Sequence, residues 1–185
     1  MDFSLKEYED DFQASLTNRL SKLLPKDWGD RSFIISNTDK EWKKVAKDVT
    51  NDLSKDRLLT QAWPEKYGGI GATNLKQAIF NHILSYMNAP INNMTGVNWI
   101  GPALMMYGNQ EQKELYLPRI SEALDQWCLL YSEPTAGSDL ASLQTHAVKN
   151  GDNYVINGQK IWASNAEESD FGLVAVRTNP DAPKH

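Results

Sequence analysis

Apolar residues recur every three or four positions through most of the first 125 residues, the spacing of one face of an α-helix. The first such stripe consists of Leu5, Tyr8, Phe12, Leu16, Leu20 and Leu23. Pro25 and the turn residues 28–30 then predict the end of this helix. A second predicted helix carries the stripe Trp42, Val45, Val49 and Leu53. A third, capped by Thr73 or Asn74, carries Leu75, Ile79, Ile83 and Met87.

Polar residues mark further helix boundaries. Thr38 and Glu41 have the spacing of a capping box, in which a hydroxyl and a carboxylate each bind a free backbone N–H. Asn109 with Gln112 predicts another helix start, and Pro118 is expected in the first turn of a last short helix. Between these helices, residues 63–71 contain three glycines and a proline, which predicts irregular backbone.

The spacing of apolar residues along the sequence changes near Trp127. Residues 127–132 form a short apolar run, residues 143–150 alternate, and residues 171–176 are rich in β-forming side chains. Asn150-Gly151 and Asn157-Gly158 each predict a hairpin turn, because such turns need a positive φ that Asn and Gly tolerate. We therefore expect an α+β protein with an all-α domain over residues 1–125 and a β domain over residues 126–185. Sixty residues supply about four strands, so we expect this β domain to be part of a larger one.

Composition narrows the function classes. The chain has 185 residues, is 41% apolar and carries a net charge of -5, with Lys and Arg scattered among acids. This pattern gives no footprint for nucleic acid or for an anionic membrane surface. No stretch approaches the roughly 18 apolar residues of a membrane span. Cys128 is the only cysteine, and the first residues lack the features of an export signal, so we expect no metal site built on thiolates and a cytoplasmic location.

Two segments carry candidate chemistry. Residues 131–139 follow a predicted strand and combine hydroxyls with a glycine, so their N–H and O–H groups could bind an anion or a polar heterocycle. Residues 157–165 place Trp162 and Ser164 two positions apart, on one face of a strand, which suits a flat ring. Each segment also has an ordinary interpretation: a connecting loop for the first, and a core Trp beside a surface Ser for the second.

Together these segments resemble the acyl-CoA dehydrogenase family. Residues 63–69 (WPEKYGG) and 107–113 (YGNQEQK) belong to the same pattern in the same order, and the resemblance covers the chain from about residue 40. It implies a helical first domain, a β-barrel middle domain and a helical last domain, with FAD between the middle and last domains. Residues 126–185 would then form a partial antiparallel β-barrel.

The resemblance also implies the site residues. Tyr131 and Ser132 would contact the isoalloxazine, Ser138 would contact substrate as well as cofactor, Trp162 would lie against the flavin, and Ser164 would donate to flavin N5. The full cofactor set is Leu129, Leu130, Tyr131, Ser132, Gly137, Ser138, Trp162, Ala163 and Ser164. Thr135 stands where the family usually has glycine, which would strain the loop if that position needed a positive φ.

The family activity is α,β-desaturation of an acyl-CoA thioester, with electron-transfer flavoprotein as the partner. Its catalytic glutamate lies in the last domain, so we assign no catalytic residue here and expect the isolated chain to be inactive. The carboxylates that we do not expect to replace it are Glu65, Glu133, Glu167 and Glu168. Two alternatives remain open: a non-catalytic subunit that completes a site, or only an interface, on a longer homologous partner, and a flavin oxidase or monooxygenase on the same fold. Besides the acyl-CoA substrate, the partner considered is a longer homologous subunit or a further copy of this chain in a homo-oligomer.

Overall fold

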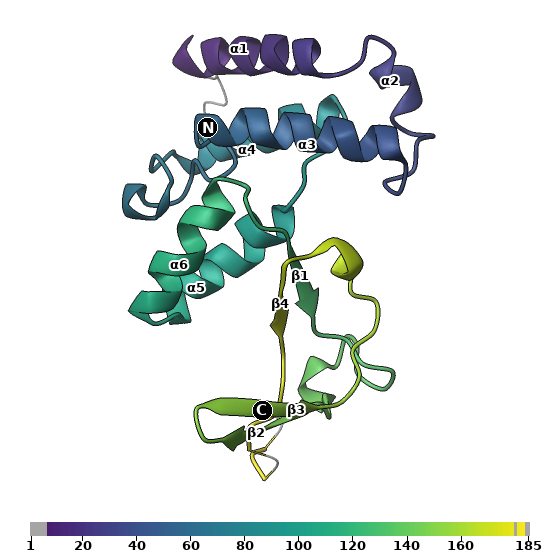
Figure 1. Cartoon of the computed structure of the whole chain (residues 1–185). Helices are drawn as coiled ribbons and strands as arrows, with labels where there is room; N and C mark the ends of the chain where they lie inside the picture. Colours follow the sequence, from purple (N-terminus) through teal and green to yellow (C-terminus); the bar gives the residue numbers. More distant parts are fainter. Residues whose placement is uncertain (1–6, 180, 184–185) are drawn as a thin grey trace. The chain divides into compact units, whose positions relative to one another are not determined.

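The computed structural model describes residues 7–179 and 181–183 (Figure 1). The chain divides into two compact units, residues 1–124 and residues 125–185. Leu5 of the first apolar stripe lies outside the described residues, and so does the side chain of Tyr8.

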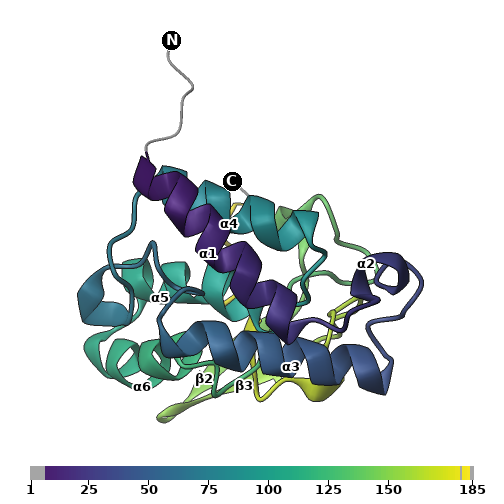
Figure 2. The ribbon, with the colours of Figure 1, turned by 90° about the horizontal axis from the view of Figure 1, so that it is seen from above.

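The first unit is helical, as predicted. Its helices are α1 (Glu7–Leu23), α2 (Trp28–Arg31), α3 (Lys40–Lys55), α4 (Asn74–Tyr86), α5 (Gly101–Tyr107) and α6 (Gln110–Ser121). A short 3₁₀ turn, η1 (Glu65–Tyr67), lies in the glycine-rich stretch, and a π-helical turn, η2 (Gly96–Ile100), precedes α5. Helix α1 contacts both α3 and α4, and α5 packs against α6 (Figure 2). No helix among the described residues has both the length and the apolar character needed to cross a membrane.

The predicted apolar stripes form the core of this unit. In α1, Leu16 and Leu20 are buried, and in α3 the stripe is buried from Val45 through Leu53. The largest side chains with almost no exposure include Phe80, Leu20, Leu53, Ile100, Leu117 and Ile120. Burying one such side chain stabilises the fold by about 1.5–3 kcal/mol, so this core accounts for much of the unit's stability. Leu75, which was predicted on the buried face of α4, is exposed instead.

Two predicted helix starts are confirmed. The Asn109 side chain accepts the N–H of Gln112 at 2.8 Å, and the Gln112 side chain accepts the N–H of Asn109 at 2.9 Å. This reciprocal capping box satisfies two backbone donors at the start of α6. At α4 the Thr73 hydroxyl accepts the N–H of Lys76 at 3.2 Å, so Thr73 and not Asn74 is the cap.

Two other predicted boundaries are wrong. The Thr38–Glu41 capping box does not form, because α3 begins after Asp39 and Glu41 pairs with Arg31 at 2.5 Å. Pro118 lies inside α6 and does not begin a helix of its own. Proline removes one N–H from the helix interior. Here α6 ends three residues later at Ser121, so only its last turn contains the proline.

The second unit contains four short strands, β1 (Trp127–Leu130), β2 (His146–Asn150), β3 (Asn153–Asn157) and β4 (Phe171–Val174). Two 3₁₀ turns, η3 (Leu140–Ser142) and η4 (Ala166–Glu168), lie in the connections. Strands β2 and β3 form an antiparallel hairpin in which Ala147 faces Ile156. Gly151, with a φ of 62°, begins the connecting turn, which confirms the hairpin predicted at Asn150-Gly151.

The other predicted hairpin, at Asn157-Gly158, is wrong. After β3 the chain has no strand until β4, and β4 pairs with β1 in a parallel arrangement (Figure 1). Gly158 has a φ of 152°, and a Cβ added there would come within 2.3 Å of the Thr145 Oγ1 atom. Glycine at this position therefore allows a close approach to Thr145. The α+β class is confirmed, but the strands of the described residues make one antiparallel and one parallel pair and no closed barrel.

Candidate functional site

The two chemistry-bearing segments lie side by side in the second unit. Strand β1 contains Leu129 and Leu130 and leads directly into Tyr131 and Ser132, all four half-buried. The backbone N–H of Ile161 donates to the carbonyl oxygen of Ser132 at 3.0 Å, so the second segment runs next to the first.

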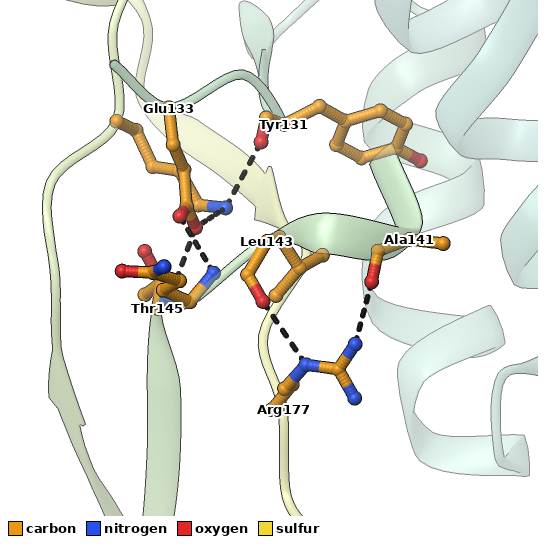
Figure 3. A network of polar contacts seen from close by, with 8 residues as sticks. Tyr131, Glu133, Ala141, Leu143, Thr145 and Arg177 are labelled. Atoms are coloured by element: carbon orange, nitrogen blue, oxygen red, sulfur yellow. Dashed lines mark hydrogen bonds and ion pairs between the residues drawn. The ribbon is translucent and has the colours of Figure 1, made fainter. Parts of the chain in front are cut away.

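Lys160 provides the second link between these segments. Its Nζ atom donates to the carbonyl oxygen of Tyr131 at 2.9 Å and to Oε1 of Glu133 at 2.8 Å (Figure 3). The side chains of Lys160 and Glu133 are only 9% and 4% exposed. A charge pair removed from water in this way is costly to break, because either partner left alone is an uncompensated buried charge.

Glu133 also binds the chain that leads into β2. Its Oε2 accepts the N–H of Gln144 at 2.7 Å and its Oε1 accepts the N–H of Thr145 at 2.9 Å (Figure 3). Burial by itself would raise the pKa of the Glu133 carboxyl. The hydrogen bonds from Lys160 and from these two backbone amides outweigh burial and lower the pKa to about 2. Glu133 is therefore ionised over the whole physiological pH range.

Residues 133–136 form a tight turn. The N–H of Glu133 donates to the Ala136 carbonyl at 2.7 Å, and the Ala136 N–H donates to the Glu133 carbonyl at 3.2 Å. Thr135 in this turn is exposed and has no positive φ, so the strain considered for a non-glycine residue at this position does not arise. Gly137 and Ser138 follow and are exposed.

The second segment differs from its predicted conformation. Trp162 and Ser164 do not lie on a strand, because Trp162 has a φ of 54° and the chain turns at Ser164. A positive φ is unusual for a bulky residue and interrupts the extended backbone. The Trp162 side chain is 81% exposed, Ser164 is exposed and Ala163 is half-buried. The alternative of a core tryptophan is thereby excluded within this chain.

Three polar side chains of the second unit organise the site but were not predicted as site residues. Lys160 and Glu133 join the two segments, as described above. Arg177 donates from Nε to the Leu143 carbonyl at 3.0 Å and from Nη2 to the Ala141 carbonyl at 2.5 Å (Figure 3). The backbone of Arg177 also bonds Thr145 and Ala147, so the segment that contains Arg177 lies beside the start of β2. The sequence shows only that one motif segment contains a Glu and the other a Lys. It does not indicate that these two side chains pair.

These features define what the site can do chemically. An exposed indole and a hydroxyl two residues away can bind a flat heterocycle, while Tyr131, Ser132 and Ser138 offer hydroxyls. Glu133 accepts three hydrogen bonds and is ionised, so it serves the scaffold. No group of three or more His, Cys, Asp or Glu side chains in the described part of the chain is arranged to hold a metal ion.

Comparison with known proteins relates both units to one family. Residues 33–123 match the model of the acyl-CoA dehydrogenase N-terminal domain, and residues 128–185 match that of the acyl-CoA dehydrogenase middle domain. Acyl-CoA dehydrogenase FadE26 of Mycobacterium tuberculosis is 42% identical over 144 residues, which cover 76% of this chain and 36% of the relative. The chain therefore spans about a third of the length of this relative.

Two solved structures share the fold over nearly the whole chain. The structure named Tcur3481-Tcur3483 steroid ACAD has a TM-score of 0.87 and 36% identity, and the match covers 100% of this chain and 47% of that one. The ChsE4-ChsE5 complex of Mycobacterium tuberculosis has a TM-score of 0.83 and 35% identity, with 97% and 45% covered. The matching motifs, both domain models and these structures agree: the chain belongs to the acyl-CoA dehydrogenase family.

Proposed function

We propose that the chain supplies the amino-terminal part of an FAD-dependent acyl-CoA dehydrogenase, which desaturates an acyl-CoA thioester between its α and β carbons. One observation carries the proposal: residues 160–161 hold residues 131–133 through the Lys160 ammonium and the Ile161 N–H. The two segments assigned to the cofactor thus form a single structure within the second unit.

The residues present fit a flavin. Trp162 offers an indole that is 81% exposed, which can lie against a flat ring, and Ser164 offers an exposed hydroxyl as the donor to N5. Tyr131 and Ser132 complete the contacts to the isoalloxazine in this proposal. The remaining positions are Ser138, which offers its hydroxyl, and a set that contributes mainly backbone: Leu129, Leu130, Gly137 and Ala163. When bound, FAD supplies the acceptor for the hydride from the β carbon.

The base that removes the α proton is proposed to lie outside these 185 residues. Glu133 is occupied by Lys160 and two backbone amides, so its carboxylate is not available to a substrate. Glu167 and Glu168 are exposed on η4 and are not proposed for this role. Ser138, exposed beyond the 133–136 turn, is the proposed contact to the substrate.

The relatives indicate a substrate class and a second candidate role. The structure at 36% identity is named a steroid ACAD, so we propose an acyl-CoA with a steroid-derived acyl group as the first substrate to test. The names Tcur3481-Tcur3483 and ChsE4-ChsE5 each join two components, which favours a second candidate: this chain as one component of a two-chain enzyme.

Electron-transfer flavoprotein is the proposed electron acceptor. A cytoplasmic location is also proposed, in keeping with the free, buried thiol of Cys128.

The test is an FAD titration of the purified chain, followed by flavin fluorescence and by absorbance after gel filtration. We expect FAD to bind and the Trp162→Ala variant to bind it at least about fivefold more weakly, because stacking on one aromatic ring contributes about 1 kcal/mol or more. The matched control is Tyr154→Ala, which removes an aromatic ring that is 57% exposed on the β2–β3 hairpin. It should bind FAD as the wild type does.

Activity is measured in the same preparation, with steroid-derived and straight-chain acyl-CoA and an artificial electron acceptor. We expect no turnover from the chain alone, since it lacks the proposed base. Absence of FAD binding would contradict a flavin site that this chain forms by itself. Turnover by the isolated chain would instead contradict the placement of the base outside it.

A further inference from the structure

Lys160 occupies a position that the assigned cofactor contacts do not explain. It immediately precedes Ile161 and Trp162, yet its own side chain turns away from solvent and is only 9% exposed. Its three N–H donors meet two acceptors from the other motif segment, the Tyr131 carbonyl and the Glu133 carboxylate. A lysine in an ordinary surface ion pair keeps its ammonium group exposed to water, and Lys160 does not.

The contacts of Lys160 and Ile161 fix two successive peptide groups of the first segment. Lys160 holds the carbonyl of Tyr131, and the Ile161 N–H holds the carbonyl of Ser132. Because each peptide group is planar and no cis peptide is present in the described chain, holding these oxygens also fixes the directions of the N–H groups that follow. The backbone of residues 131–133 is thereby set in one orientation.

The same contacts bear on Trp162. Its φ of 54° is a conformation that a bulky side chain rarely adopts, and such a conformation persists only where neighbouring contacts determine it. Lys160 and Ile161 are the two residues before it, and both are tied to the first segment. Directly after Trp162, the Ala166 N–H donates to the Ala163 carbonyl at 3.2 Å and closes a turn on the other side.

We propose that Lys160 is a positioning residue for the cofactor: through Tyr131 and Glu133 it holds the backbone of the first segment and the exposed indole of Trp162 in one register. The inference rests on the proposed flavin site and goes beyond its assigned contacts, because Lys160 acts through residues that touch the cofactor.

The first measurement uses the chain without any cofactor. Hydrogen exchange of the Ile161 amide reports the Ile161–Ser132 bond directly. We expect Lys160→Met to speed this exchange at least about tenfold, since a hydrogen bond to a charged group is lost beside it. The Lys160→Arg variant, which can still donate to both oxygens, should remain within about threefold of the wild type.

The second measurement is the FAD affinity of the same variants. Lys160→Met should weaken FAD binding at least about tenfold and Lys160→Arg should restore most of it. The double variant Lys160→Met/Glu133→Gln separates positioning from stability, because it removes both buried charges and should recover the thermal midpoint. We expect it to recover stability and still bind FAD weakly.

The outcomes are distinct. If the double variant recovers both the thermal midpoint and FAD affinity, Lys160 is only structural and the proposal fails. It also fails if exchange at Ile161 is unchanged in Lys160→Met. If the wild type binds no FAD, the proposed flavin site fails. The exchange measurement then still decides whether Lys160 holds the two segments together.

Discussion

Residues 1–124 surround buried aliphatic and aromatic side chains, whereas residues 125–185 bury few large apolar groups and depend on polar side chains that bind the backbone. In the helical unit, Phe80 and its neighbours are almost fully buried. In the β unit every residue of β3 is exposed, and the side chains of Glu133, Lys160 and Arg177 make hydrogen bonds that span 11 to 36 residues. A packed core tolerates changes of surface charge, while a network of charged groups depends on each member.

The difference also separates scaffold from site. The proposed cofactor residues all lie in the β unit, where Trp162 and Ser164 are exposed and available to a ligand. The buried ion pair of Lys160 and Glu133 joins the two segments that contain these residues. Hydrogen bonds between defined atoms fix direction as well as distance, which suits a surface that must present an aromatic ring in one orientation.

The largest effect is expected from the helical core. Phe80→Ala removes a side chain with 0% exposure and should lower the free energy of unfolding by about 3–5 kcal/mol, from lost burial and the cavity left behind. Urea denaturation followed by circular dichroism measures this. Phe33→Ala is the control, because Phe33 is 84% exposed and its loss should change stability by no more than about 0.5 kcal/mol.

Hydrogen exchange of the Phe80→Ala variant tests whether the two units are independent. Faster exchange confined to peptides of residues 1–124 would support two separately stabilised units. Equal acceleration in peptides of residues 125–185 would show a single cooperative structure, and the two units would then not be stabilised separately.

The next effect belongs to the β unit and depends on pH. The folded chain lowers the pKa of Glu133 from 4.5 to about 2. The unfolded state therefore binds more protons between these values, so the contribution of Glu133 is fully present above pH 4.5 and is lost as the pH falls through about 2. From the size of the shift, this contribution is on the order of 3 kcal/mol.

The measurement compares the wild type with Glu133→Gln in urea denaturation at a series of pH values between neutral and about 2. Other carboxylates are common to both proteins, so the difference between the two curves isolates Glu133. We expect the wild-type excess in the free energy of unfolding to shrink as the pH falls through this window. In limited digestion at low pH, we expect pepsin to cleave residues 125–185 before the helical unit. Parallel curves would mean that the buried carboxylate does not stabilise the β unit.

The sequence predicted the helical unit well because its signals are local. The stripes of α1 and α3 repeat within each helix, and Asn109 with Gln112 lies within one turn. The Thr38–Glu41 prediction failed although its spacing is the same, since Arg31 competes for Glu41 from outside the helix. A pattern of spacing contains no information about such a competitor.

The β unit was predicted less well because its pairings are distant in sequence. Alternation indicates which face of a strand is buried, but not which strand lies beside it, so the parallel pairing of β1 with β4 could not be foreseen. The two motif segments were recognised from their residues and assigned to a cofactor through a family resemblance, whereas the Lys160–Glu133 pair, 27 residues apart, was not predicted. The positive φ of Trp162 also has no sequence signal, because bulky residues rarely adopt it.

The smallest effect comes from a polar contact of the helical unit. Asn109→Ala removes the acceptor for the Gln112 N–H and should cost about 1 kcal/mol in the free energy of unfolding. Thr38→Ala is the matched control, because the Thr38 hydroxyl bonds Ser36 and α3 has no side-chain cap. It should cost less than about 0.5 kcal/mol. Both are measured by urea denaturation at neutral pH. If Asn109→Ala cost as much as Phe80→Ala, the helical unit would depend on polar contacts as the β unit does.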